Sequence, residues 1–137
     1  MLQPPVSVVD DVDLRLVVPG DEGLLLTATL RYEASDPYAV EATFRAGEEA
    51  ISWVLGRDLL SDGLQSECGE GDVHVWPTVE DGHTVVMLQL SSPDGSALLA
   101  ADADGLEGFL ARTYDAVPLG YEGDHLDVDS AIVQLLA

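Results

Sequence analysis

The chain has 137 residues and carries 26 acidic side chains against five basic ones, all arginine, for a formal net charge of −21. This length fits one domain, and this charge repels DNA, RNA and anionic membranes at long range. Cys68 is the only cysteine, which excludes an intrachain disulfide and favours a cytoplasmic protein, and no apolar run reaches the ~18 residues of a membrane span.

The first part of the chain is predicted to form strands, because apolar and polar residues alternate and so occupy opposite faces of a sheet. Between Val6 and Val18 the apolar residues share one parity, which Asp10 breaks; Asp10 marks either a bulge or the true start of the strand. Gly20–Gly23 is a predicted turn. Three further alternating runs follow, namely Leu24–Tyr32, Tyr38–Phe44 and Ile51–Leu55.

The middle of the chain mixes a short helix with a hairpin. Arg57–Leu64 is predicted as a helix of at most two turns that ends at Gly63. Pro93-Asp94-Gly95 is a tight hairpin signal, since proline presets the first turn position and glycine accepts a positive φ. The remaining segments are a loop at Gln65–Gly71, two strands at Asp72–Thr78 and Thr84–Ser91, and a seventh strand at Ser96–Ala101 that could equally begin a helix.

Two helices are predicted towards the C-terminus. Asp104 is the expected N-cap of the first, with Glu107 as its capping-box partner, and Pro118 with Gly120 ends it. A last helix is expected to begin at Asp127 or Asp129. The apolar stripes are Leu106, Phe109, Leu110 and Tyr114 in the first helix, and Val128, Ile132, Leu135 and Leu136 in the last. The pattern predicts an α+β fold of about seven antiparallel strands followed by helices, in a single domain spanning residues 1–137.

No motif in the sequence indicates catalysis or a cofactor. The three histidines and Cys68 do not have zinc-ligand spacing. Asp102–Gly105 lacks the spacing of a calcium loop, and Gly69–Asp72 carries acids where a phosphate cradle needs free N–H groups. We therefore predict a protein that is not an enzyme and has no catalytic, metal or cofactor-binding residues.

Large side chains suggest where a partner could bind. Trp53 shares the parity of Ile51 and Leu55, which favours the core. Trp76 has the parity of His74 and faces away from Val73 and Val75. It is either an exposed interface anchor or part of a second buried layer under helices. Trp76, His74 and Arg57 are the candidate partner-interface residues.

Four tracts in fixed order resemble the SsgA-like sporulation and cell-division proteins of actinobacteria, and within them most closely the SsgB type. They are Asp36–Phe44, Ile51–Leu60, Gly71–Pro77 and Leu90–Leu99. The segment from Phe109 to Pro118 is similar to the helix of the family and its exit. The resemblance runs from about Leu14 to the C-terminal helix, and residues 1–11 are expected to be a variable stretch.

The resemblance implies a Whirly-like fold assembled as a homotrimer. It also implies a non-enzymatic scaffold that lies in the cytoplasm at septum sites and helps recruit FtsZ together with an SsgA-type protein. A trimer fits the strand near Val86, whose two faces are both apolar and need cover. The alternative is a single-stranded nucleic-acid-binding Whirly-like protein, which would have to gather most of its five arginines in one groove.

Overall fold

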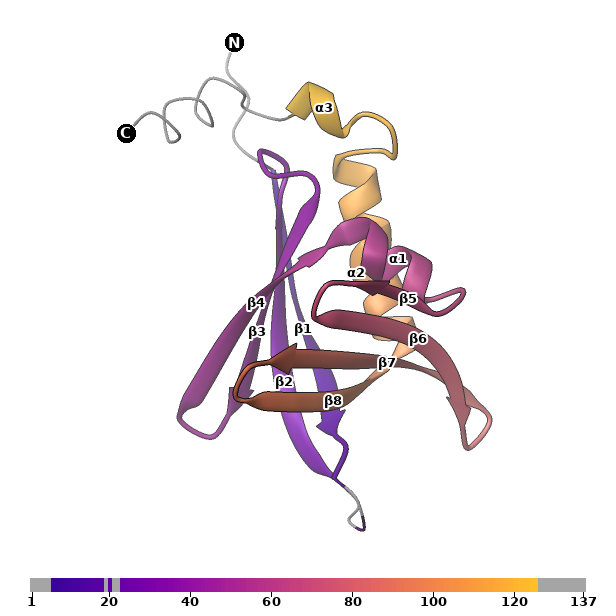
Figure 1. Cartoon of the computed structure of the whole chain (residues 1–137). Coiled ribbons are helices and arrows are strands. Elements are labelled where there is room, and N and C mark those ends of the chain that lie inside the picture. The colour runs from indigo at the N-terminus through magenta and orange to yellow at the C-terminus, as the bar shows by residue number, and fades with distance from the viewer. Residues whose placement is uncertain (1–5, 19, 21–22, 126–137) are drawn as a thin grey trace.

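One antiparallel sheet forms the body of the computed structural model, which describes residues 6–18, 20 and 23–125 (Figure 1). Its eight strands lie in the order β4-β3-β2-β1-β8-β7-β6-β5. The strands are β1 Ser7–Leu16, β2 Leu24–Glu33, β3 Ala39–Ala46, β4 Glu49–Gly56, β5 Cys68–Glu70, β6 Val73–Glu80, β7 His83–Ser92 and β8 Gly95–Asp102. The helices are α1 Arg57–Gly63, α2 Ala103–Ala116 and α3 Glu122–His125. The predicted antiparallel α+β class is confirmed.

The strand count is eight and not seven, so the sequence prediction was wrong by one strand. The additional strand is β5, which lies inside the predicted loop Gln65–Gly71 and pairs with β6 through Cys68↔Val75 to Glu70↔Val73. Three residues are too few to show an alternating pattern, and a glycine stands at the centre of the three. Pairing with a long neighbour, and not local propensity, defines this strand.

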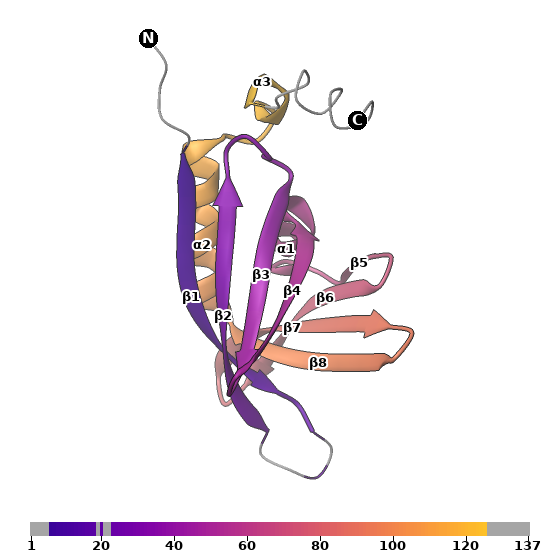
Figure 2. The same cartoon turned by 90° about the vertical axis from the view of Figure 1, so that its left-hand side faces the viewer.

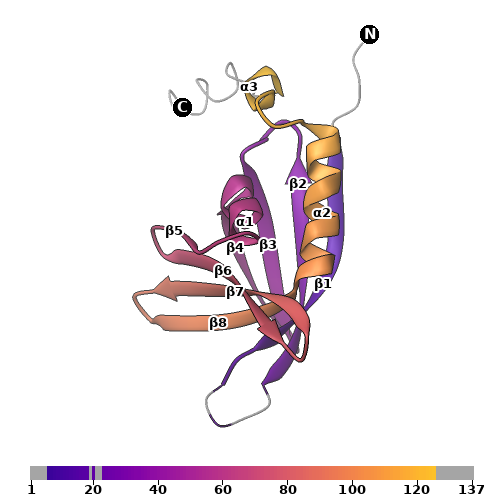
Figure 3. The same ribbon diagram turned by 90° about the vertical axis from the view of Figure 1, so that its right-hand side faces the viewer.

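The sheet bends into two four-stranded halves (Figure 2). Strands β1–β4 run along the length of the molecule, whereas β5–β8 cross them steeply. The two halves meet where β1 pairs with β8 over only three positions, Leu14↔Ala101 to Leu16↔Leu99. Helices α1 and α2 lie inside the bend, and α2 runs beside β1 (Figure 3). The core therefore forms between the inner faces of both halves and the two helices.

Burial confirms the predicted alternation within β2 and β3, whereas Leu24 and Tyr38, which were predicted on the same inner faces, are exposed at the strand ends. In β2 the buried residues are Leu26, Ala28, Leu30 and Tyr32, and in β3 they are Val40, Ala42 and Phe44. These residues meet Val86, Leu88 and Leu106 from the other side of the bend. Burying apolar area of this kind, at roughly 25 cal/mol per Å², is the main stabilising contribution to a domain of this size.

Asp10 is neither a bulge nor the start of a strand, which corrects both sequence-based alternatives. The β1–β2 register runs without interruption from Ser7↔Glu33 to Leu16↔Leu24. Asp10 has the inward parity because α2 lies over it, and its carboxylate forms an ion pair with Arg112 of that helix. A long-range partner thus explains the acidic residue on an otherwise apolar face.

Two of the hairpin turns contain residues whose backbone preferences fit the turn conformation. The β6–β7 turn has Asp81 at φ 50° and Gly82 at φ 80°, the two positive φ values of a type I′ turn. The predicted Pro93-Asp94-Gly95 turn is confirmed: Ser92 pairs with Gly95, whose φ is 144°. Proline in the loop and glycine at the positive φ are both placed where their backbone preferences fit.

Helix α2 begins two residues earlier than predicted. Its N-cap is Asp102, whose carboxylate accepts a hydrogen bond from the Asp104 backbone N–H at 3.1 Å. Both aspartates suit a cap, and the strand that runs up to Asp102 selects the first one. Of the predicted stripe, Leu106, Phe109 and Leu110 are buried and Tyr114 is partly buried against the core. The predicted last helix, from Asp127 or Asp129, lies outside the described residues, and α3 was not predicted.

The helices also bear on whether the chain could cross a membrane. Within the described ranges, none of the helices has the length and hydropathy required to cross a bilayer.

Candidate functional site

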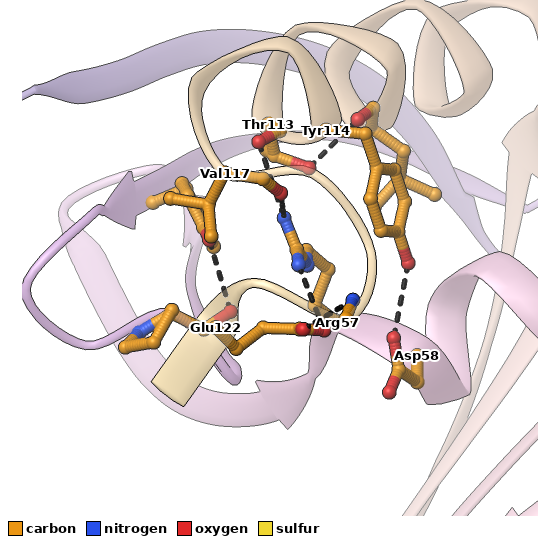
Figure 4. Close-up of polar contacts among 10 residues, drawn as sticks. Arg57, Asp58, Thr113, Tyr114, Val117 and Glu122 are labelled. Atoms are coloured by element: carbon orange, nitrogen blue, oxygen red, sulfur yellow. Dashed lines mark hydrogen bonds and ion pairs between the residues drawn. The ribbon is translucent and has the colours of Figure 1, made fainter. Parts of the chain in front are cut away.

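A buried arginine lies where α1, α2 and α3 come together (Figure 4). Arg57 is the first residue of α1, and its side chain is 0% exposed. Its Nη1 donates to the carbonyl oxygens of Thr113 at 3.1 Å and Val117 at 2.8 Å. Its Nη2 donates to Glu122 Oε2 at 3.1 Å. The planar fork of guanidinium donors suits such a multi-acceptor arrangement.

Aromatic rings enclose the same guanidinium. The centre of the Tyr114 ring is 4.0 Å from the guanidinium carbon of Arg57, and that of Tyr32 is 5.0 Å away. These are favourable cation–π distances. Each hydroxyl is bonded in turn: Tyr114 donates to Asp58 at 3.1 Å, and Tyr32 donates to the Pro37 carbonyl at 3.0 Å. Acceptors bond both terminal nitrogens of the guanidinium and two π faces lie beside it, while the buried Nε has no hydrogen-bond partner among the described residues.

The ionisation of the cluster follows from these contacts. The pKa of the Glu122 carboxyl is lowered, first by the backbone N–H of Glu122 itself, then by that of Gly120 at 2.6 Å and by the Arg57 guanidinium. Burial raises the pKa of Tyr32 to about 12 and also raises the pKa of Tyr114. At neutral pH the cluster therefore holds an ionised arginine–glutamate pair between two neutral tyrosines.

This cluster is built to hold the structure together. Arg57 binds the carbonyls of Thr113 and Val117 at the C-terminal end of α2, where the helix dipole is negative. The Thr113 carbonyl also accepts from the Val117 backbone N–H at 2.9 Å. Through Glu122 it also fixes the chain after the helix. Full burial removes Arg57 from the surface that a partner could touch, so the structure places it as an internal clamp, apart from the other two interface candidates.

Replacing Glu122 by glutamine is expected to lower the free energy of unfolding at neutral pH. It should also make that free energy fall less steeply as the pH is lowered. Because the folded pKa of Glu122 is lowered, its contribution is present above the ordinary glutamate value of about 4.3 and is lost as the pH falls through the folded value. Urea unfolding at about pH 7 and about pH 3 measures this. The gap between wild type and Glu122→Gln should shrink towards acid.

The matched control for that experiment is Glu107→Gln. Glu107 is an exposed residue of α2 that takes part in none of the ion pairs among the described residues. It undergoes the same change of charge, and we expect nearly unchanged stability. A gap for Glu122→Gln that stays constant with pH would contradict the assignment of the buried pair.

His74 and Trp76 lie together on the outer face of β6. His74 is exposed and Trp76 is half-buried. The alternate residues of the strand, Val73 and Val75, are buried on the inner face. Trp76 pairs with Met87 of β7, and Met87 is also half-buried. Helix α1 packs on the opposite face, where Gly63 meets Val75. Of the two alternatives for Trp76, the structure favours an outward-facing residue over a second layer under helices.

A second surface feature is a hollow of about 540 Å³ between the two halves of the sheet. It lies between the β3–β4 hairpin and the β7–β8 hairpin. Its apolar lining includes Phe44, Ile51, Trp53, Leu90 and Leu99, and its rim includes Arg45, Glu49 and Asp94. Trp53 is partly buried here and packs against the core, as its parity predicted. Sequence reasoning did not find the hollow, because residues from opposite halves of the sheet form it.

The arginines do not form a groove for nucleic acid. Arg15 pairs with Glu80, Arg31 with Glu33 and Arg112 with Asp10, and Arg57 is buried with Glu122. The fifth, Arg45, donates to the Thr29 hydroxyl. Single-stranded nucleic-acid binding needs a continuous positive surface with stacking aromatics, and four of the five arginines are paired with carboxylates.

The described residues define an α+β domain with an ion pair buried among its helices and apolar side chains on its surface. Within residues 6–18, 20 and 23–125 no group of three or more His, Cys, Asp or Glu side chains could hold a metal ion. Among the described residues, the titratable groups with shifted pKa values, Tyr32, Tyr114 and Glu122, belong to the cluster around Arg57.

Comparison with known proteins identifies the family. A family model described as Streptomyces sporulation and cell division protein, SsgA, matches residues 26–122. The chain belongs to the SsgA family.

Its relatives include the sporulation-specific cell division proteins SsgB of Streptomyces coelicolor and of Frankia casuarinae. The Streptomyces coelicolor protein is 51% identical to this chain over 93% of both chains. The Frankia casuarinae protein is 46% identical to it over 95% of this chain and 92% of the relative.

Solved structures support the same conclusion. The fold matches an SsgA-like sporulation-specific cell division protein from Thermobifida fusca with a TM-score of 0.88, at 40% identity and 98% coverage of both chains. It also matches a structure reported with mutations in SsgB that correlate with longitudinal cell division during sporulation of Streptomyces coelicolor. The TM-score is 0.87 at 48% identity, covering 92% of this chain and all of that one. The resemblance stated from the sequence tracts is confirmed.

Proposed function

We propose that this chain is a non-enzymatic scaffold of sporulation-specific cell division, which acts in the cytoplasm at septum sites and helps recruit FtsZ together with an SsgA-type protein. The observation that carries the proposal is the similarity to SsgB proteins over nearly the whole chain. The similarity extends over more than nine tenths of this chain and is not confined to one short motif.

Structural features support a binding role. Arg57 joins three helices through its ion pair with Glu122 and its hydrogen bonds to the carbonyls of Thr113 and Val117, and its buried side chain is shielded from substrates. The outer face at Trp76 and the hollow at Trp53 present apolar area to solvent. Tryptophan is enriched in the residues that dominate protein interfaces, and contiguous exposed apolar surface marks an interaction site.

Deletion of the gene from its native organism tests the role in cells. The expected result is loss of sporulation septa with vegetative growth intact, and restoration by the wild-type gene. In vitro, the purified chain should co-sediment with FtsZ polymers, and an SsgA-type protein should increase the amount recovered. Normal sporulation septa in the deletion strain would contradict the proposal, as would failure of both binding assays with folded protein.

The assembly state follows as a second proposal, a homotrimer. An apolar outer face on β6 and β7 requires cover, and α1 covers the other side. Light scattering at micromolar concentration should return about three times the mass of 14.5 kDa. Trp76→Glu is expected to shift the protein towards monomer, whereas Val79→Glu, on the same strand at an already exposed position, should leave the mass unchanged. Monomer mass for the wild type would refute the trimer.

A further inference from the structure

Strand β4 is an open edge of the sheet. It stands first in the strand order, and among the described residues only β3 pairs with it. The β3–β4 hairpin lies at the left of Figure 1, away from α2. Natural proteins usually protect such an edge with proline, lysine, a bulge or a short strand. β4 has eight residues in unbroken register, contains none of these residues, and has Glu49 as its single charged residue.

The register shows which backbone groups are free. The Arg57 N–H donates to the Tyr38 carbonyl at 2.8 Å, which makes this a hydrogen-bonded pair. Hydrogen-bonded pairs recur at every second position of an antiparallel ladder, so Leu55, Trp53 and Ile51 bond to β3. The N–H and C=O groups of the intervening residues Ala50, Ser52 and Val54 therefore point outwards.

The side chains of β4 are unusually apolar for an edge. Ile51 is 60% exposed and lines the hollow together with Trp53. Val54 is 70% exposed on the opposite face. A strand added beside β4 would place alternate side chains over the hollow and over Val54, because successive residues of a strand point to opposite faces.

The charges at the two ends of this edge indicate the occupant. Glu48 precedes the strand and Glu49 begins it, and both are exposed. At the other end Asp58 is exposed, and the Glu70 carboxylate lies 3.8 Å from the position that a Cβ on Gly56 would take. An apolar centre between two acidic ends complements an extended segment with alternating apolar residues and a positive charge at each end.

A second copy of this chain fits the edge poorly. Symmetric pairing of one edge with itself is two-fold and antiparallel. It would bring Glu48 and Glu49 of one copy towards Asp58 and Glu70 of the other, and like charges that face each other across strands are destabilising. The charge pattern thus selects a different partner.

We propose that the outer edge of β4 binds an extended, basic-flanked apolar segment of a partner protein by strand addition, with alternate side chains entering the hollow beside Ile51 and Trp53. Main-chain hydrogen bonds to Ala50, Ser52 and Val54 supply affinity, and the hollow supplies specificity. The proposal rests on the proposed scaffold function, because it names the surface and the chemical class of segment that such a scaffold would bind.

A synthetic peptide tests the edge directly. The probe has lysines at both ends and alternating valine and threonine between them, and binding is followed by fluorescence anisotropy. A copy with N-methyl groups on the alternate core amides that face β4 keeps the charge and side chains but cannot complete the ladder. We expect it to bind about tenfold more weakly or worse. Equal binding of the two peptides would overturn strand addition in favour of simple charge attraction.

Amide hydrogen exchange locates the contact. In the free protein the amides of Ala50, Ser52 and Val54 should exchange quickly, and those of Ile51 and Trp53 slowly. The peptide should protect the fast set. Peptide binding without this protection would overturn the proposal, and this measurement uses the wild-type chain, so it does not depend on the folding of any variant.

Two variants with a matched control complete the test. Val54→Pro removes one outward N–H that β3 does not use, and Ile51→Lys places a positive charge where the peptide packs. Both should weaken peptide binding about tenfold. Val79→Lys makes a similar change at a residue of β6 that is 69% exposed, in the other half of the sheet, and should leave binding unchanged. Equal weakening by Val79→Lys would contradict the assignment.

The same variants separate this inference from the proposed function. If the wild type captures FtsZ and Val54→Pro and Ile51→Lys capture it equally well, the edge assignment fails and the scaffold function stands. If the peptide protects Ala50, Ser52 and Val54 while the wild type captures no division protein, the edge assignment stands and the proposed function fails.

Discussion

Replacing Arg57 by leucine is expected to lower the free energy of unfolding by about 3–5 kcal/mol, because one partner of a buried ion pair is removed and the other is left uncompensated. The Glu122 carboxylate loses its cation, and the carbonyls of Thr113 and Val117 lose the guanidinium as a donor, although Thr113 still accepts from the Val117 N–H. Leucine fills part of the space but offers no hydrogen bond. Urea unfolding at neutral pH, followed by tryptophan fluorescence, measures the loss.

Arg31→Leu is the matched control for this experiment. It makes the same substitution and the same change of charge, but in a pair with Glu33 whose arginine side chain is 52% exposed. Exposed ion pairs contribute about 0–1 kcal/mol, so we expect little change. Similar losses at the two positions would show that repulsion within the −21 chain dominates, and would contradict the clamp.

Gly63→Ala is expected to lower the free energy of unfolding by about 1–3 kcal/mol through overpacking. Gly63 ends α1, and a Cβ there would lie 2.2 Å from Val75 Cγ1 and 2.6 Å from Val75 Cβ. Both distances are far below van der Waals contact, so α1 or β6 has to move. Thermal and urea unfolding of the purified variant measure the loss.

Gly108→Ala is the matched control and should have the opposite sign. Gly108 lies within α2, and a Cβ there would meet no atom within 4 Å. Alanine is favoured over glycine in a helix by roughly 0.8–1.0 kcal/mol, so the variant should gain stability. A stable Gly63→Ala variant would show that α1 packs less closely on β6 than the structure indicates.

The local features of the fold could be predicted from the sequence. Alternation found the inner faces of β1–β4, the stripe of Leu106 and Phe109 found the buried side of α2, and Pro93-Asp94-Gly95 found a hairpin. Each of these signals depends on residues that are close together in the chain. Strand β5 was missed because its three residues carry no such pattern and depend on β6 for their structure.

The Arg57 cluster could not be predicted because its partners are distant in the chain. Glu122 is 65 positions from Arg57, and the Thr113 carbonyl is 56 positions away. The one available signal was the position of an arginine directly after the apolar run that forms β4, where a charged residue must be either exposed or paired. The same limit applies to Asp10 and Arg112, and to the hollow between the two halves.

The narrow junction between β1 and β8 has a consequence for how the chain folds. Each half of the sheet is a run of consecutive hairpins that closes over short turns, whereas the three-position junction joins residues from opposite ends of the chain. Local hairpins form within microseconds, and contacts between distant segments form more slowly. The two meanders should therefore fold first, and the rate of the whole domain should depend on the encounter of Leu14–Leu16 with Leu99–Ala101.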